Sequence, residues 1–86
     1  MTSKEFEYAA KNVVRDMLKR REIAADIDGL NLVWYSYLLG DYKCMIYGEC
    51  MGNLYAEVTY SLYSQTLFAD LYQKLEHKEM HDWDFE

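Results

Sequence analysis

Few residues in this 86-residue chain have side chains that readily bind a transition metal. The two cysteines and two histidines together form a Cys₂His₂ set: Cys44, Cys50, His77 and His81. Thiolate and imidazole ligands in this combination favour zinc. His77 and His81 are four positions apart, so on a helix both rings would project from the same side. Because a small domain gains stability from such a metal, the sequence predicts a structural zinc site.

The spacing of these ligands leaves an alternative open. Five residues separate Cys44 from Cys50, whereas most zinc sites have two to four. In a straight strand the two sulfurs would lie about 20 Å apart, so the site needs a turn near Gly48. Glu76 or Asp82 could replace one cysteine. In the alternative, Cys44 is a buried apolar residue, Cys50 lies in a loop and both histidines are solvated. A disulfide between the cysteines is disfavoured in a reducing compartment.

Motifs for catalysis are missing from the sequence. It has no Gly-rich phosphate loop, no G-x-S-x-G elbow and no H-E-x-x-H zinc motif. A nucleophilic cysteine, Cys44 or Cys50, activated by His77 is the one catalytic alternative that these residue types offer. We therefore expect a protein that is not an enzyme.

The C-terminal residues alternate acidic and aromatic side chains. Asp82, Trp83, Asp84, Phe85 and Glu86 follow one another at the end of the chain. Tryptophan and phenylalanine contribute strongly to protein contacts. These five residues are therefore either packed back onto the domain or a neighbouring copy, or they bind the basic groove of a partner protein.

Charge is distributed unevenly along the chain. Residues 1–21 carry six basic and three acidic side chains, whereas residues 22–86 carry three basic and twelve acidic ones, for a total of −6. The basic cluster Lys19, Arg20 and Arg21 suits the last turn of a helix, where cations complement the helix dipole. The acidic remainder would repel nucleic acid and attract a basic protein surface.

Periodicity predicts the elements that must position these residues. Thr2 and Glu5 form a capping box, and apolar residues then recur at helical spacing to about Arg21. Residues 31–39, 42–49 and 54–62 favour strands of an antiparallel meander. Residues 64–81 fit a helix, although Leu67, Ala69 and Leu71 could also alternate in a fourth strand.

The alternation also predicts the two faces of the sheet. The inner face is expected to hold Leu32, Trp34, Leu38, Cys44, Ile46, Ala56 and Val58. The outer face is expected to show Tyr35, Tyr37, Met45, Tyr47 and Tyr55. The predicted fold is α+β, a single small domain over residues 1–86, with a three-stranded antiparallel sheet and two helices in the order α-β-β-β-α, in two layers. No apolar run is long enough to span a bilayer, and residues 1–5 do not resemble a signal peptide, so we expect a soluble cytoplasmic protein.

Several short segments resemble a family of small proteins encoded by phages of Gram-positive bacteria. They are residues 3–6, Val33-Trp34, residues 55–60 and residues 71–76. The family has no assigned function, and Cys44, Cys50 and residues 77–86 depart from it. In size and acidic charge the chain is also similar to anti-CRISPR inhibitors, which occupy basic, nucleic-acid-binding surfaces of a nuclease.

These expectations lead to a function without catalysis. We expect a phage protein that acts in the cytoplasm of the host cell and inhibits a host defence protein that binds nucleic acid, such as a Cas9-type CRISPR effector. It would contact the partner's basic surface without binding nucleic acid or membrane itself. The alternative is a small structural or assembly protein of the phage that acts as a homo-oligomer through its tyrosine-rich sheet face.

Overall fold

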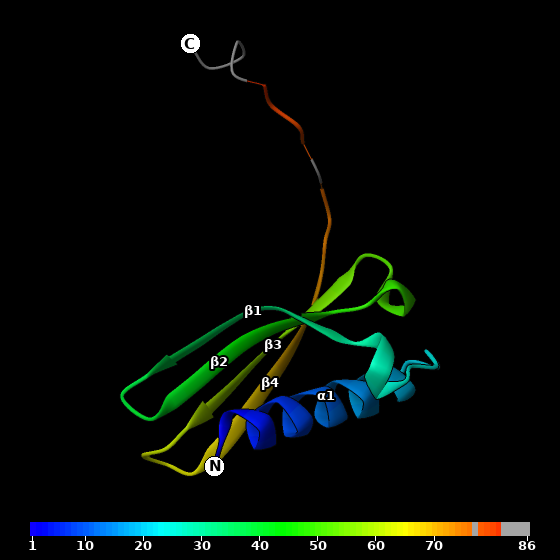
Figure 1. Cartoon of the computed structure of the whole chain (residues 1–86). Helices are drawn as coiled ribbons and strands as arrows, with labels where there is room; N and C mark the ends of the chain where they lie inside the picture. The colour runs from blue at the N-terminus through cyan, green and yellow to red at the C-terminus, as the bar shows by residue number, and fades with distance from the viewer. Residues whose placement is uncertain (77, 82–86) are drawn as a thin grey trace.

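A computed structural model describes residues 1–76 and 78–81. It consists of one long helix, α1 (Ser3–Lys19), followed by a four-stranded antiparallel sheet (Figure 1). The strands are β1 (Asn31–Leu38), β2 (Asp41–Tyr47), β3 (Leu54–Ser61) and β4 (Thr66–Gln73). Two short 3₁₀ helices lie in the connections, η1 (Ile27–Gly29) before β1 and η2 (Glu49–Met51) before β3.

Helix α1 begins where the sequence predicts. The Thr2 hydroxyl accepts a hydrogen bond from the Glu5 amide at 3.1 Å, and the Glu5 carboxylate accepts one from the Thr2 amide at 3.0 Å. This capping box satisfies two free amides at the helix start. The helix packs on β2, β3 and β4 through a stripe of fully buried side chains. They recur every four residues: Phe6, Ala10, Val14 and Leu18.

The sheet is a simple meander in the order β1-β2-β3-β4. Leu39 and Gly40 form the turn between β1 and β2, and both have positive φ, 52° and 87°. A two-residue turn with positive φ at both positions matches the right-handed twist of the strands that it joins. A Cβ atom at Gly40 would lie 2.5 Å from the Leu62 side chain, so any other residue here would require Leu62 to move.

The predicted C-terminal helix is wrong, and residues 66–73 form the fourth strand instead. All eight residues of β4 pair with β3, from Ser61 opposite Thr66 to Leu54 opposite Gln73. Leu67, Ala69 and Leu71 point toward the core, because β4 alternates between half-buried and exposed side chains. Pairing with β3 outweighs the helical propensity of these residues. The fold is thus α+β with a single long helix and four strands in the described residues.

The prediction of the sheet faces is correct for β2 and β3 and wrong for most of β1. Cys44, Ile46, Ala56 and Val58 are fully buried against α1, and Leu32 packs on the same core. The register of β1 shifts between Leu32 and Trp34, where Val33 forms a bulge. The extra residue reverses the alternation beyond this point.

The bulge therefore exchanges the predicted faces of four residues. Trp34 pairs with Met45 on the outer face. Leu38, which is 70% exposed, points toward the same face. Tyr35 and Tyr37 instead lie on the helix side, in ring contact with the buried aromatic residues of the core. The Tyr35 hydroxyl is hydrogen-bonded to the Ser3 hydroxyl of α1 at 2.8 Å.

Candidate interaction surface on the open face of the sheet

The sheet has two very different faces. Helix α1 lies against one of them, and no element in the described part of the chain covers the other (Figure 1). We call this second surface the open face. It carries aromatic and apolar side chains from all four strands: Trp34, Met45, Tyr47, Tyr55, Phe68 and Tyr72. Charged side chains lie on the same face: Asp41, Lys43, Glu57 and Asp70.

The exposure of these rings is the unusual feature of the open face. Trp34 and Tyr72 are each 39% exposed, and Phe68 is 52% exposed. An antiparallel sheet with one face in water normally alternates apolar residues inward with polar residues outward. Here the outward positions hold large aromatic side chains instead. Contiguous apolar surface of this kind marks a site of contact with another molecule.

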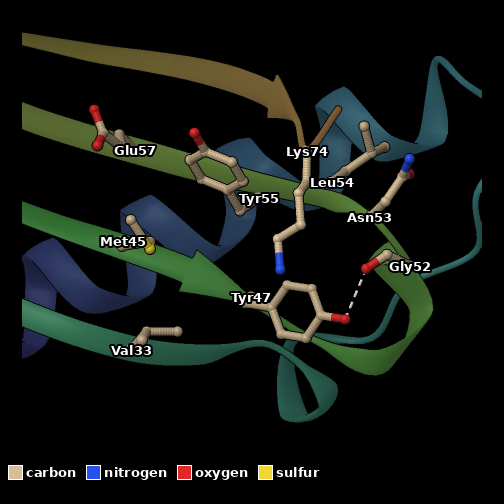
Figure 2. A pocket seen from close by; sticks show the side chains of 9 residues that line it. All are labelled: Val33, Met45, Tyr47, Gly52, Asn53, Leu54, Tyr55, Glu57 and Lys74. Carbon is tan, nitrogen blue, oxygen red and sulfur yellow. Dashed lines mark hydrogen bonds between the residues drawn. The ribbon is translucent and has the colours of Figure 1, made fainter. Parts of the chain in front are cut away.

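One end of the open face is hollowed to a volume of about 450 Å³. Val33, Met45, Tyr47 and Tyr55 line it together with the loop between β2 and β3, and Figure 2 shows the Lys74 side chain extending across it toward Tyr47.

Hydrogen bonds fix the shape of the hollow. The Tyr47 hydroxyl donates a hydrogen bond to the Gly52 carbonyl at 2.7 Å. The Lys74 amide donates one to the Asn53 carbonyl at 2.7 Å. The loop between β2 and β3 therefore holds Tyr47 and the backbone of Lys74 in place at the edge of the hollow.

Two tyrosines and two carboxylates form the centre of the β3–β4 half. Tyr55 and Tyr72 lie opposite each other and their rings stack at 5.2 Å. Glu57 lies directly opposite Asp70, the next outward pair along the strands. Burial, followed by the charges of Asp70 and Glu57, raises the pKa of Tyr72.

The Glu57–Asp70 pair is an electrostatic cost to the isolated chain. Like charges directly opposite each other on neighbouring strands are destabilising. The two salt bridges among the described residues, Lys11–Glu7 and Arg15–Asp16, both lie on α1. No described cation neutralises the two carboxylates, so this part of the open face would gain from a cation supplied by a partner.

The predicted zinc ligands are in dissimilar surroundings. Cys44 is fully buried between the sheet and α1, whereas Cys50 is exposed in η2. His81 lies in the described segment 78–81, and His77 lies outside the described residues. Within the described residues no group of three or more His, Cys, Asp or Glu side chains could hold a metal ion.

The chemistry of Cys44 fits a core residue better than a ligand or a nucleophile. Burial, with a contribution from the charge of Glu7, raises the pKa of the Cys44 thiol to about 11. Zinc binding and nucleophilic attack both need the thiolate. The zinc site and the Cys–His pair stay predictions, and either one would have to form against this preference if it used Cys44.

The five predicted partner-binding residues, Asp82, Trp83, Asp84, Phe85 and Glu86, lie outside the described residues. The described residues before them, 74–76 and 78–81, have no regular secondary structure and are exposed. They lead away from the end of β4 (Figure 1).

Sequence reasoning misses three members of the open face. Strict alternation assigns Trp34 to the inner face, because a bulge has no clear mark in a single sequence. The helical pattern assigns Phe68 and Tyr72 to the apolar stripe of a helix. The signal for β4 is the alternation of Leu67, Ala69 and Leu71, which places Phe68, Asp70 and Tyr72 together on the other side.

No helix in the described residues has the length and hydrophobicity needed to cross a lipid bilayer.

Comparison with known proteins identifies a family for this chain. No curated protein and no solved structure matches the chain. Residues 7–82 match the model of a family described as a family of unknown function (DUF6275). This match covers α1 from its second turn, the whole sheet and the start of the C-terminal segment. The chain therefore belongs to this family.

Proposed function

We propose that this chain is a non-enzymatic interaction protein that binds another protein through the open face of its sheet. The observation that carries the proposal is the exposure of aromatic side chains over a complete face of the sheet. Tryptophan and tyrosine are the residues most enriched at the energetic centres of protein interfaces. Lys43, Glu57 and Asp70 lie among these rings and offer charged groups to the same partner.

The proposal unites the two functions expected from the sequence. An inhibitor of a host defence protein and a homo-oligomeric phage structural protein both need a surface that binds protein. The open face can serve either function. Neither function requires the zinc site.

The charge of the chain favours a basic partner for the inhibitor function. After residue 21 the chain has a net charge of −9, from three basic and twelve acidic side chains. This negative charge attracts the basic, nucleic-acid-binding surface of a CRISPR effector, and we propose such an effector as the target. The acidic C-terminal residues would extend this contact beyond the sheet.

Binding to a purified Cas9-type effector tests the proposal. Biolayer interferometry should detect a complex that weakens as salt rises, and the complex should reduce DNA cleavage by the effector. Trp34→Ala on the open face should weaken binding at least about tenfold, the effect of losing one buried aromatic contact. Tyr8→Ala is the matched control, because Tyr8 is 65% exposed on α1 and lies away from the open face.

The C-terminal residues are tested in the same assay. Reversing the charges of Asp82, Asp84 and Glu86 to lysine should weaken binding further, and unchanged binding would remove them from the interface. Equal loss of binding in Trp34→Ala and Tyr8→Ala would contradict the use of the open face. An effector that does not bind the chain at all would overturn the proposed target.

A further inference from the structure

We propose that the outer edge of β1 pairs with the same edge of a second copy of this chain, so that two four-stranded sheets join into one continuous antiparallel sheet. The two-fold axis would pass through Ser36, perpendicular to the sheet. This contact uses the edge of the sheet and not its open face. It therefore goes beyond the proposed function and can be tested separately.

Strand β1 is exposed along its edge and on both of its faces. It lies at one end of the strand order, and no strand of the described residues pairs with its outer side. All of its residues except Leu32 are exposed. Helix α1 packs on β2, β3 and β4, and the start of the helix touches β1 through Tyr35. The outer edge of β1 therefore offers unpaired backbone groups to another strand.

The composition of β1 is unusual for an exposed edge. Natural edge strands normally carry charged residues that prevent pairing with another chain. β1 has no charged residue, whereas β4 at the opposite edge carries Asp70. Six exposed apolar or aromatic residues lie in β1 or directly after it: Val33, Trp34, Tyr35, Tyr37, Leu38 and Leu39. A continuous run of this kind is typical of a fully buried strand.

These six residues are arranged symmetrically about Ser36. They form pairs at one, two and three positions from it: Tyr35 and Tyr37, Trp34 and Leu38, Val33 and Leu39. In an antiparallel pair centred on Ser36, Tyr35 of one copy lies opposite Tyr37 of the other. Trp34 likewise lies opposite Leu38, so apolar side chains meet apolar side chains throughout. A two-fold contact requires a self-complementary surface, and this symmetry favours a second copy over an unrelated strand.

The backbone of β1 fits the same register. Leu38 and Asp41 close the two-residue turn as a hydrogen-bonded pair, and such pairs alternate with non-hydrogen-bonded pairs along the hairpin. The N–H and C=O groups of Tyr35 and Tyr37 therefore point away from β2, toward the free edge. With Ser36 on the axis, Tyr35 of each copy exchanges a pair of hydrogen bonds with Tyr37 of the other. Centring the contact on Tyr35 or Tyr37 would lose part of this pairing.

The paired segment is short, so we expect a weak dimer. The bulge at Val33 ends the regular ladder on one side, and the turn at Leu39 ends it on the other. Residues 34–38 span about 17 Å at roughly 3.3 Å per residue. A contact of this length is smaller than a standard protein interface, so monomer and dimer should exchange at micromolar or higher concentrations.

Sedimentation velocity tests the dimer directly. Over concentrations from about 1 μM to about 1 mM, the mass should rise from the 10.3 kDa of one chain toward twice that value. Tyr37→Pro removes an N–H that points to the free edge, a position where an edge strand tolerates proline. Tyr37→Ala is the matched control, because it loses the same side chain and keeps the N–H. The proline variant should dimerise at least about tenfold more weakly than the alanine variant, because it lacks hydrogen bonds on both sides of the axis.

Disulfide crosslinking tests the position of the axis. Two copies of Ser36 would form a non-hydrogen-bonded pair with Cα atoms about 4.5 Å apart, a distance that a disulfide can bridge. In a Cys50→Ser background, where Cys44 is buried, mild oxidation of Ser36→Cys should give a covalent dimer. Lys43→Cys is the matched control, because Lys43 is the partner of Ser36 on β2. Its two copies would lie three strand spacings apart, about 14 Å, which is too far for a disulfide.

Three results would overturn the edge dimer. They are a monomer at every concentration, a dimer that Tyr37→Pro and Tyr37→Ala weaken equally, and crosslinking of Lys43→Cys that equals that of Ser36→Cys. Far-ultraviolet circular dichroism confirms that each variant is folded, and if Tyr37→Pro does not fold, the crosslinking comparison decides alone. The effector assay with Trp34→Ala and Tyr8→Ala is read separately, so either proposal can fail while the other stands.

Discussion

At the scale of single residues, the two cysteines show how position decides chemistry. Cys44 alternates inward on β2 and is completely enclosed by the sheet and α1. Removing a thiolate from water is costly, so burial favours the neutral thiol and raises its pKa. Cys50 has the same side chain but lies exposed in η2. The shared residue type suggests a common metal site, whereas the difference in burial gives the two thiols different reactivity.

Thiol labelling should distinguish the two cysteines. Iodoacetamide at pH 8 should modify Cys50 and leave Cys44 unmodified in the native protein, because Cys44 is both buried and protonated. Mass spectrometry should find one adduct in buffer and two in concentrated urea. Cys50→Ser is the control and should show no native adduct. Fast native labelling of Cys44 would contradict the assigned core position.

At the scale of elements, the bulge in β1 accommodates one extra residue, Val33, without changing the pairing on either side of it. Val33 is inserted between two positions that otherwise continue the pairing with β2, Leu32 opposite Ile46 and Trp34 opposite Met45. Without the insertion, Trp34 would still follow Leu32 in regular alternation, with the same partners. The bulge is thus an addition to the strand that leaves the rest of the register intact.

Deleting Val33 should therefore be tolerated. We expect the free energy of unfolding to fall by less than about 1 kcal/mol, because Val33 is 57% exposed and every other pair of β1 is kept. Deleting Ser36 is the matched control in the same strand. It moves Tyr37 or Tyr35 to the opposite face and should cost several times more. Urea denaturation measures both, and equal costs would contradict the assigned register.

The sequence is sufficient to predict α1 and three strands, but not the last element. The capping box and the apolar repeat of α1 are local features, and the structure confirms both. Residues 66–73 satisfy a helical and an extended pattern at once. The choice depends on the free edge of β3, which is a property of the assembled sheet and not of the segment itself.

The candidate site is less predictable than the fold for the same reason. Met45, Tyr47 and Tyr55 are correctly predicted to point outward because β2 and β3 alternate regularly. The positions of Trp34, Phe68 and Tyr72 depend on a bulge and on a strand pairing that arise only in the folded chain. The aromatic composition therefore predicts an interaction surface, and the topology determines which residues form it.

At the scale of the whole molecule, a single long helix can cover only one face of the sheet. A helix with its side chains is about 10–12 Å wide, whereas four strands span roughly 19 Å. Helix α1 therefore provides one core, formed with β2, β3 and β4. The open face remains uncovered because the described residues contain no second long helix.

The last ten residues should be dispensable for this core. The described core and the side chains packed on it extend no further along the chain than Leu71. Removing residues 77–86 should therefore change the free energy of unfolding by less than about 0.5 kcal/mol in urea denaturation. Removing residues 70–86 is the control and should unfold the chain, because it also removes half of β4. A large loss from the shorter truncation would make the C-terminal residues part of the fold.

The outward position of Trp34 has a practical consequence. An indole in contact with water emits at longer wavelength than one that is enclosed, and Trp34 lies on the open face, where a partner bound over β1 and β2 would cover it. With Trp83 replaced by phenylalanine, the chain would hold a single indole at this position. The wavelength of its emission maximum would then report, without any attached dye, whether a partner is bound to the open face.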